Sequence, residues 1–382
     1  MSTARSTLAT LPLAAFALCL ITPGAFAQSS PTSPYAPTAS STPSSPSAEN
    51  ENSLTPFTRQ QLLRDLDKDM AEVILLYDVI KGTPAVDLTP QDARQQISAQ
   101  DAAKIIARAT GLAEAPTPVG KVTDGMTIEG RDGNQIPIRI YTPAGTGPFP
   151  VITYFHGGGF VIATIDTYDE SARNLCKDAN AIVVSVEYRK APEAPYPAAL
   201  HDAIDSYKWV TSNIARYDGI SAKVALAGES AGGNLATEVA IAARDQNLQR
   251  PTHQLLIYPV TSSNVNQPSD ILYANALPLN TPLLKYFFKF YLTNPSQAND
   301  PGVAPINADL RNLPPATIIA AEEDPLQSDG RAYAAKLRAS GDQVTYRLFQ
   351  GTTHEFFGMG AVVAKAKAAE RFGAARIAAS FR

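Results

Sequence analysis

From about residue 149 onward, short apolar runs alternate with segments of helical spacing, and this alternation restricts the fold more than any other feature. The runs FPVITYF and AIVVSVEY lack the in-and-out pattern of a half-exposed strand, so we expect both of their faces to be buried. Between such runs lie amphipathic segments such as AALHDAIDSYKWVTSNIARY. Strands that alternate with helices form a mostly parallel sheet flanked by helices. We therefore predict the α/β fold class.

The predicted elements cover most of the chain. The expected strands of the sheet are 149–155, 181–188, 223–230, 253–259, 316–324 and 344–349. The helices expected between or after them are 198–217, 232–246, 328–341 and 361–381. Two further strand-like runs, at 125–130 and 136–143, flank the turn sequence RDGN and predict a hairpin.

Two other regions are expected to be helical. The apolar spacing predicts one helix over 57–80 and a second over 98–111, with Ser98 or Asp101 as its N-cap. Segment 262–312 interrupts the strand–helix alternation and contains the aromatic run LLKYFFKFYL. We expect this segment to fold as a lobe over the carboxyl edge of the sheet.

The first 27 residues have the features of a secretory signal peptide. Arg5 precedes an apolar run over 8–21, and the segment ends in AFA at 25–27, which matches a cleavage site. The apolar run is short for an uncleaved membrane anchor, the alternative interpretation. Residues 28–52 are rich in Ser, Pro, Thr and Ala, which is typical of a disordered spacer. We expect an exported protein, periplasmic or secreted, cleaved near Ala27, with its folded domain at 53–382 and no membrane span in the mature chain.

Composition and charge exclude several classes of partner. Hydrophobic residues make up 45% of the chain and the formal net charge is −4, without a cluster of Lys and Arg. A large core is therefore possible, whereas nucleic acids and anionic membranes are poor partners. The four histidines and two cysteines show no metal-ligand spacing, so we expect no metal site. Cleavage would remove Cys19, and Cys176 alone cannot form an intramolecular disulfide.

The motif GESAG at 228–232 follows the apolar run KVALA and precedes a predicted helix. G-x-S-x-G between a strand and a helix is typical of a nucleophile elbow, where glycines allow a sharp turn that exposes the serine hydroxyl. Since the bare motif also occurs by chance in chains rich in Gly and Ser, the flanking strand and helix support this interpretation. Ser230 is therefore the candidate nucleophile.

Three consecutive glycines follow His156 at the end of the strand 149–155. When a serine attacks an ester carbonyl, the oxygen becomes an oxyanion, and backbone N–H groups about 3 Å away stabilise it. Glycines let the reacting group approach the main chain closely. We expect the N–H groups of Gly158, Gly159 and Ala231 to form the oxyanion hole, with His156 and Gly157 as supporting loop residues. A simple flexible turn is the alternative interpretation.

A serine nucleophile needs a general base, and four histidines are available. His354 follows the last predicted strand, in a loop expected to overhang the edge of the sheet, and is the best candidate. His156 belongs to the glycine loop, His201 to a predicted helix, and His253 opens a predicted strand.

The base in turn needs a carboxylate to orient it. Asp324 ends the strand 316–324 and faces the following loop, which favours it for this role. Glu322, Glu323 and Asp329 remain alternatives on the sequence alone. Asp329 lies at the start of a predicted helix, where an acidic residue is ordinary structural capping.

The chain order of serine, acid and histidine is that of α/β-hydrolases. The motifs HGGGF and GESAGGN resemble those of the hormone-sensitive-lipase-like family of α/β-hydrolase carboxylesterases. The segment VEYRKAPEAPYPAALHDA at 186–203 is similar to a further family block, as are DPLQSDGRAYAAKLRASG and THEFF in the acid and histidine regions. The resemblance covers about 122–357 well and the N-terminal helices more weakly.

This resemblance implies an α/β-hydrolase fold with a helical cap from about 53–115 and 262–312. It implies a serine carboxylesterase that acts through an acyl-enzyme intermediate, without a cofactor. We expect short- to medium-chain acyl esters as substrates, because no strongly apolar, amphipathic lid for long chains stands out in the sequence. It assigns the nucleophile to Ser230, the acid to Asp324 and the base to His354. Because members of this family often pair through edge strands, a homodimer is an expectation that the sequence leaves open. Lys190 and Glu355 depart from the family pattern, which has leucine and glycine at these positions.

Two alternatives to an esterase remain. The same three residues could serve an amidase or peptidase, which a comparison of p-nitrophenyl esters with matching anilides would separate. A non-catalytic ligand-binding protein can also share a fold with enzymes, and an ester turnover assay would decide that case.

Overall fold

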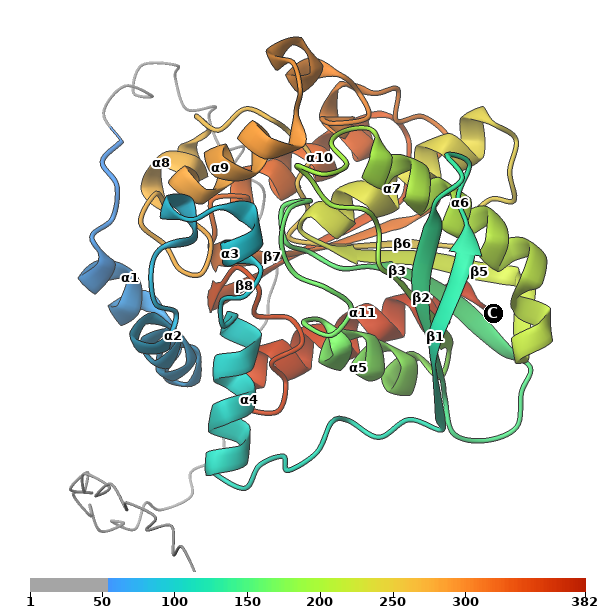
Figure 1. The fold of residues 1–382 in the computed structure, drawn as a ribbon, viewed down its shortest axis with the longest axis horizontal. Helices are drawn as coiled ribbons and strands as arrows, with labels where there is room; N and C mark the ends of the chain where they lie inside the picture. The colour runs from blue at the N-terminus through green and yellow to red at the C-terminus, as the bar shows by residue number, and fades with distance from the viewer. Residues whose placement is uncertain (1–53) are drawn as a thin grey trace, which may run out of the picture. The chain divides into compact units, whose positions relative to one another are not determined.

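The computed structural model describes residues 54–382, in which eight strands form one sheet in the order β1-β2-β4-β3-β5-β6-β7-β8 (Figure 1). The strands are β1 (Lys121–Glu129), β2 (Gln135–Thr142), β3 (Phe149–Phe155), β4 (Ile182–Val186), β5 (Gly219–Glu229), β6 (Gln254–Ile257), β7 (Ala316–Glu323) and β8 (Val344–Thr353). Strand β2 pairs antiparallel with β1 and β4, and the remaining neighbours pair parallel. The predicted α/β class, with a mostly parallel sheet flanked by helices, is confirmed.

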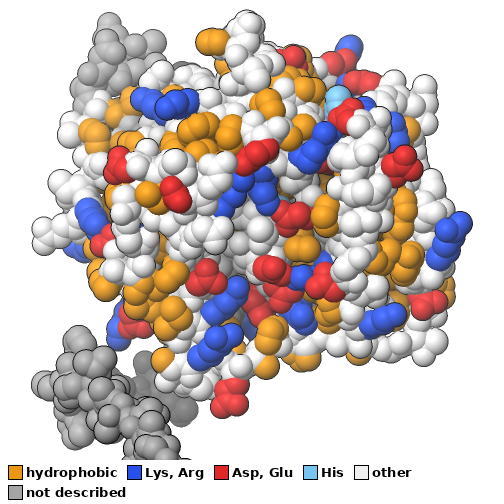
Figure 2. All heavy atoms as spheres, in the orientation of Figure 1, with side chains coloured by type: hydrophobic (Ala, Val, Ile, Leu, Met, Phe, Trp, Pro, Cys, Tyr) orange, Lys and Arg blue, Asp and Glu red, His pale blue; other side chains and the backbone are white. Residues whose placement is uncertain are grey.

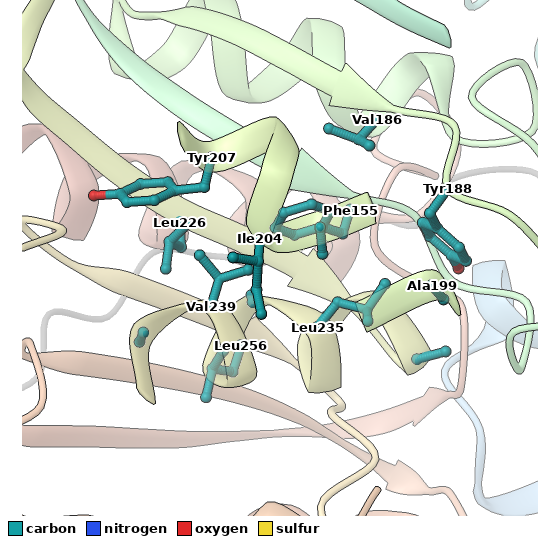
Figure 3. Packing of buried hydrophobic residues seen from close by; sticks show 14 of the residues in the cluster. Phe155, Val186, Tyr188, Ala199, Ile204, Tyr207, Leu226, Leu235, Val239 and Leu256 are labelled. Carbon is teal, nitrogen blue, oxygen red and sulfur yellow. The ribbon is translucent and has the colours of Figure 1, made fainter. Parts of the chain in front are cut away.

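Helices cover both faces of this sheet (Figure 1). Helices α6 (Ala198–Asn213), α7 (Ala231–Asp245) and α10 (Gln327–Ala339) pack on one face, and α5 (Asp169–Ala179) and α11 (Ala364–Ser380) pack on the other. On the first face, Ile204 and Val239 lie in one buried cluster with Phe155 and Leu226 of the sheet (Figure 3). Burying one such side chain contributes about 1.5–3 kcal/mol. The central strands are buried on both faces, which explains their continuous apolar runs.

The predicted helix over 57–80 is wrong in one respect, because the chain forms two helices, α1 (Arg59–Asp65) and α2 (Lys68–Ile80). Between them Leu66 is extended, with φ of −70° and ψ of 149°. The backbone N–H of Asp67 donates to the carbonyl oxygen of Gly351 in β8 at 2.9 Å. A contact with a distant strand therefore interrupts a helix whose hydrophobic periodicity continues on both sides of the break.

Helix α4 (Ala99–Ala109) resolves the choice of N-cap. Ser98 is the N-cap, and its hydroxyl accepts a hydrogen bond from the backbone N–H of Asp101 at 3.1 Å. The Asp101 carboxylate accepts one from the Ser98 backbone N–H at 3.0 Å. Both residues thus belong to one capping box, which satisfies two backbone donors at the helix start.

Helix α5 lies between β3 and β4, where the sequence analysis expected no element. Its segment DESARNLCKDA is largely polar, but Leu175 and Cys176 are buried against the sheet. The helix ends at Asn180, whose φ of 47° is left-handed, a conformation that Asn adopts more readily than most residues. Burial raises the pKa of the Cys176 thiol to about 12.

Helices α8 (Pro268–Leu272) and α9 (Thr281–Tyr291) interrupt the strand–helix alternation between β6 and β7. They lie beside the N-terminal segment that contains α1 and α3 (Pro90–Ala93) (Figure 1). The Tyr286 hydroxyl of α9 donates to the carbonyl oxygen of Leu88 at 3.2 Å. The N–H of Phe57 donates to the carbonyl oxygen of Leu272 at 2.9 Å. Two segments far apart in the sequence are thus joined directly.

On the face drawn in Figure 2, acidic and basic side chains are interspersed rather than separated by sign. Among residues 54–382, no helix combines the length and the apolar character needed to cross a membrane. The predicted signal peptide (1–27) and spacer (28–52) lie outside the described residues.

Candidate active site

Ser230 lies at the sharp turn between β5 and α7. Its φ of 55° and ψ of −117° are unusual for a residue with a side chain, and such strain is often found at functional sites. The backbone holds this geometry because the Ser230 N–H donates to the carbonyl oxygen of Ile257 at 2.9 Å. A Cβ atom at Gly232 would overlap the carbonyl oxygen of Phe155, so only glycine allows α7 to start so close to β3. The local chain therefore forms the elbow that GESAG predicted.

His354 follows β8 and brings two distant residues into one hydrogen-bonded row. Its Nε2 lies 3.0 Å from the Ser230 hydroxyl oxygen, and its Nδ1 lies 2.7 Å from the Asp324 carboxylate. All three side chains are buried, with exposures of 6%, 2% and 0% for Ser230, His354 and Asp324. The second Asp324 oxygen accepts a hydrogen bond from the Leu326 backbone N–H at 2.8 Å. The serine hydroxyl thus has a base within reach, and the base has a carboxylate that fixes its orientation.

The environment of His354 favours its protonated form. Burial alone lowers the pKa of this imidazole, but the charge and hydrogen bond of Asp324 outweigh burial, and Glu355 adds to their effect. The net result is a pKa above the ordinary value for histidine. A base with a raised pKa accepts the serine proton more readily when the hydroxyl attacks.

Three other acidic residues were alternatives to Asp324 as the partner of His354, and the structure gives their side chains other environments. Glu322 accepts a hydrogen bond from the Gly351 N–H at 2.7 Å. Asp329 is buried and accepts hydrogen bonds from the N–H groups of Thr261 and Ser262 at 2.9 and 3.0 Å. It therefore holds the loop after β6 rather than acting as ordinary capping at the start of α10. Burial raises the pKa of Glu323 to about 8, and no hydrogen bond or ion pair joins its side chain to His354 within residues 54–382.

The other histidines are also placed elsewhere. His201 lies 3.2 Å from the Asp132 carboxylate, and the Nε2 of His253 lies 2.9 Å from the Thr317 hydroxyl. Within the described residues, no group of three or more His, Cys, Asp and Glu side chains is arranged to hold a metal ion.

The glycine loop after β3 lines the same cavity as Ser230 and His354. Gly158 has φ of 106°, and a Cβ atom there would overlap the carbonyl oxygen of Ile162. Within residues 54–382, the N–H groups of Gly158, Gly159 and Ala231 donate to no protein acceptor. Ala231 is the first residue of α7, where backbone N–H groups are free and the helix dipole favours negative charge. These N–H groups are therefore free to donate hydrogen bonds to an anionic oxygen.

His156 and Gly157 hold this loop from behind. The Nδ1 of His156 lies 2.7 Å from the carbonyl oxygen of Gly157, and its ring stacks on Tyr188 with 4.4 Å between the centroids. The Tyr188 hydroxyl donates to the carbonyl oxygen of His156 at 2.8 Å. His156 thus orients the loop and does not contact the serine hydroxyl, for which His354 provides the hydrogen bond.

A buried carboxyl behind the serine was missed by the sequence analysis. Glu229 is fully buried and accepts hydrogen bonds from the hydroxyl groups of Tyr154, at 2.6 Å, and Tyr258. The Tyr258 ring in turn lies 4.5 Å from the His354 ring. Burial raises the pKa of Glu229 to about 7. The sequence feature that could have indicated this network is Glu229 itself, an acidic residue at the end of an otherwise apolar strand, directly before the serine.

Lys190 and Glu355, the two residues that depart from the family pattern, lie in different surroundings. The Lys190 ammonium donates to the carbonyl oxygen of Ala163 at 2.9 Å and pairs with Glu187. Glu355 lines the cavity of Ser230, and its φ of 64° is left-handed, which is the conformation that a glycine at this position would adopt easily.

The cavity beside Ser230 has a volume of about 110 Å³. Its apolar wall comes largely from α9 and the chain before it, with Leu279, Leu283, Leu284, Phe287 and Phe288. The polar side is formed by Ser230, His354 and the glycine loop. A nucleophile, a base, free N–H donors and an apolar wall therefore meet in one small space, as acyl transfer requires.

Comparison with known proteins is consistent with this geometry. A family model described as "alpha/beta hydrolase fold" matches residues 152–358. The ethyl acetate hydrolase of Pseudomonas putida is 33% identical over 311 residues, which cover 79% of this chain and 95% of that protein. The carboxylesterase NlhH of Mycobacterium tuberculosis is 39% identical over 254 residues, which cover 65% of this chain and 80% of that protein.

Among solved structures, an esterase of Pyrobaculum calidifontis superposes with a TM-score of 0.74 at 34% sequence identity. The match covers 82% of this chain and 98% of that one. These relatives confirm the resemblance found in the motifs, and they support carboxylic ester hydrolysis as the activity. The chain therefore belongs to the α/β-hydrolase family, among the carboxylesterases that resemble hormone-sensitive lipase.

Proposed function

We propose that this protein is a serine carboxylesterase that acts through an acyl-enzyme intermediate. The observation that carries the proposal is the row Ser230–His354–Asp324, with distances of 3.0 and 2.7 Å between successive side chains. In the first step, the Ser230 oxygen attacks the ester carbonyl and Nε2 of His354 takes the hydroxyl proton. Asp324 holds the proton on Nδ1, so that Nε2 is free to accept.

The attack turns the carbonyl oxygen into an oxyanion. We assign its stabilisation to the N–H groups of Gly158, Gly159 and Ala231, which are fixed before the substrate arrives. The protonated His354 then gives its proton to the leaving alcohol. Water enters, loses a proton to His354, and releases the carboxylic acid from Ser230 by the same route.

We further propose that the acyl group is short to medium in length. The small volume beside Ser230 and the wall of Leu284, Phe287 and Phe288 support an apolar group of limited size. A series of p-nitrophenyl esters from C2 to C12 measures this preference, which we expect to peak at or below about eight carbons. The matching anilides test amidase activity in the same experiment.

The decisive test of the mechanism is Ser230→Ala. We expect p-nitrophenyl acetate hydrolysis to fall by about 10⁴-fold or more, because the nucleophile is lost. The thermal transition should stay close to that of the wild type, since one hydroxyl is removed from a turn whose backbone contacts remain. Activity retained in a folded Ser230→Ala protein would reject the assignment.

Two further proposals come from the sequence and the family resemblance. Residues 1–27 direct export, so N-terminal sequencing of the exported protein should begin at Gln28. The protein forms a homodimer through an edge strand of the sheet, for which light scattering provides the test.

A further inference from the structure

We propose that the cavity beside Ser230 selects esters that carry a cationic group, such as a quaternary ammonium, and that the Glu355 carboxylate is the side chain that selects them. This inference rests on the proposed esterase function and names a substrate class for the same site. It follows from where Glu355 lies, from what neutralises it, and from the rings around it.

The position of Glu355 is set by its place in the chain, by a hydrogen bond to its backbone and by its backbone conformation. The residue directly follows His354 and lines the cavity that also contains Ser230. Its carbonyl oxygen accepts a hydrogen bond from the buried side-chain amide of Gln100 at 2.9 Å. Its φ of 64° is one that a residue with a side chain rarely adopts, so the turn carries strain that a glycine would avoid. The backbone conformation therefore gives no reason for a glutamate at this position, which leaves its side chain to be explained.

The Glu355 carboxylate is poorly neutralised. Its hydrogen-bond partner is the Tyr168 hydroxyl, at 3.3 Å from Oε1. Within residues 54–382, no Lys or Arg side chain forms an ion pair with it. A half-buried carboxylate without a cation is costly, because burial disfavours its charge, and a bound cation would remove this cost.

His354, which also lines the cavity, stabilises the Glu355 charge when it is protonated, but it is neutral when it acts as the base. The remaining charged groups of the cavity leave the negative charge in place. Arg94 is the basic residue of the cavity lining, but its guanidinium donates to the Glu193 carboxylate at 2.6 and 2.8 Å. It also donates to the carbonyl oxygens of Val161 and Ala191, each at 2.7 Å. The second carboxylate of the lining, Asp101, accepts hydrogen bonds from the backbone N–H and hydroxyl of Ser98.

Aromatic rings surround the same space. Tyr77, Phe287 and Phe288 line the cavity with Glu355. The Tyr77 phenol lies near enough that the Glu355 charge, after burial, contributes to raising its pKa. The ammonium group of Lys81, the C-cap residue of α2, lies 5.9 Å from the centroid of the Tyr77 ring and is paired with Asp78 at 2.9 Å. A carboxylate beside aromatic faces is the combination that recognises quaternary ammonium groups.

The test compares cationic esters with neutral esters of the same shape, at pH 8. Acetylcholine and 3,3-dimethylbutyl acetate place the charge on the alcohol side. The p-nitrophenyl esters of 4-(trimethylammonio)butanoic acid and 5,5-dimethylhexanoic acid place it on the acyl side. We expect kcat/KM of the wild type to favour the cationic ester in at least one pair, by about threefold to tenfold. Glu355→Gln should abolish this preference, measured as the ratio of kcat/KM between the two members of a pair, whatever its effect on the absolute rates.

Glu72→Gln is the matched control, because it removes one exposed carboxylate of α2 that lies outside the cavity lining. We expect it to leave the cation preference unchanged, which would exclude a general effect of net charge. If the wild type hydrolyses the neutral ester of each pair at least as well as the cationic one, the inference is wrong. The same holds if Glu355→Gln keeps the preference. Failure to hydrolyse either member of both pairs would instead contradict the proposed esterase function.

Discussion

The side-chain amide of Gln100, in helix α4, donates a hydrogen bond to the backbone carbonyl oxygen of Glu355 at 2.9 Å. The same amide nitrogen donates to the carbonyl oxygen of Phe357 at 2.7 Å. The two partners flank the turn directly after His354, and they are more than 250 residues away from Gln100 in the chain. An N-terminal helix therefore holds the loop that presents the proposed catalytic base.

We expect Gln100→Ala to lower kcat for p-nitrophenyl acetate by about tenfold to a hundredfold, because small displacements of a catalytic group are costly. Two buried carbonyl groups would also lose their donor, which should destabilise the fold by about 2 kcal/mol. Steady-state kinetics and thermal unfolding measure the two effects. The exposed Gln95→Ala is the control, and both quantities should stay near wild-type values there. An unchanged kcat in Gln100→Ala would show that the loop keeps its position without this clamp.

The pH dependence of activity reports on His354. Since the base must be neutral to accept a proton, and its pKa is raised, kcat/KM should increase with pH through a midpoint above 6.5, the ordinary histidine value. Glu355→Gln removes one of the negative charges that raise this pKa, so the midpoint should move to lower pH. Profiles measured with a neutral ester test this directly. A midpoint that stays in place or moves upward in the variant would contradict the assignment.

Asp324→Asn tests the orienting carboxylate. The amide can donate a hydrogen bond to Nδ1 of His354, which favours the tautomer whose proton lies on Nε2 and blocks proton acceptance from Ser230. We expect kcat to fall by about 10⁴-fold with little change in structure. Glu322→Gln is a suitable comparison, because Glu322 lies in β7, two residues before Asp324, but accepts its hydrogen bond from Gly351. If Glu322→Gln lost activity to the same extent, the role assigned to Asp324 would not be specific.

Gly158→Ala tests the proposed oxyanion hole. The added Cβ atom would overlap the carbonyl oxygen of Ile162 and displace the loop, so kcat should fall by about 10²–10³-fold. The control is Gly145→Ala, whose φ of 112° is similarly positive but whose Cβ atom would meet no heavy atom within 4 Å. It carries a comparable backbone strain at an exposed loop. A large loss of kcat in both variants would indicate a general effect of backbone strain.

Phe288→Ala tests the wall of the cavity. Phe288 is half-buried and lines the cavity from α9, so its removal should widen the space at a modest cost in stability. We expect the optimum of the p-nitrophenyl ester series to move to longer acyl chains, because a larger apolar group can then be buried. The exposed Lys289→Ala, the next residue in α9, should leave the optimum unchanged. An unmoved optimum in Phe288→Ala would place the acyl group elsewhere.

Much of the fold was readable from the sequence because its signals are local. A strand buried on both faces needs a continuous apolar run, and GESAG specifies a turn within five residues. The break between α1 and α2 was not readable, because it depends on the contact of Asp67 with Gly351. Helix α5 was missed because its segment is polar, and its stability comes from packing Leu175 and Cys176 against the sheet.

The sequence by itself determined the class of fold, the serine and the glycine loop, since each of these depends on residues that are neighbours in the chain. Only the tertiary structure decided which carboxylate faces His354, because the parallel pairing of β7 with β8 brings their ends together and engages Glu322 and Asp329 in other hydrogen bonds. It also decided that Glu355 enters the cavity and that Gln100 holds its backbone. The physical reason is that a hydrogen bond forms over about 3 Å of space, whatever the separation along the chain.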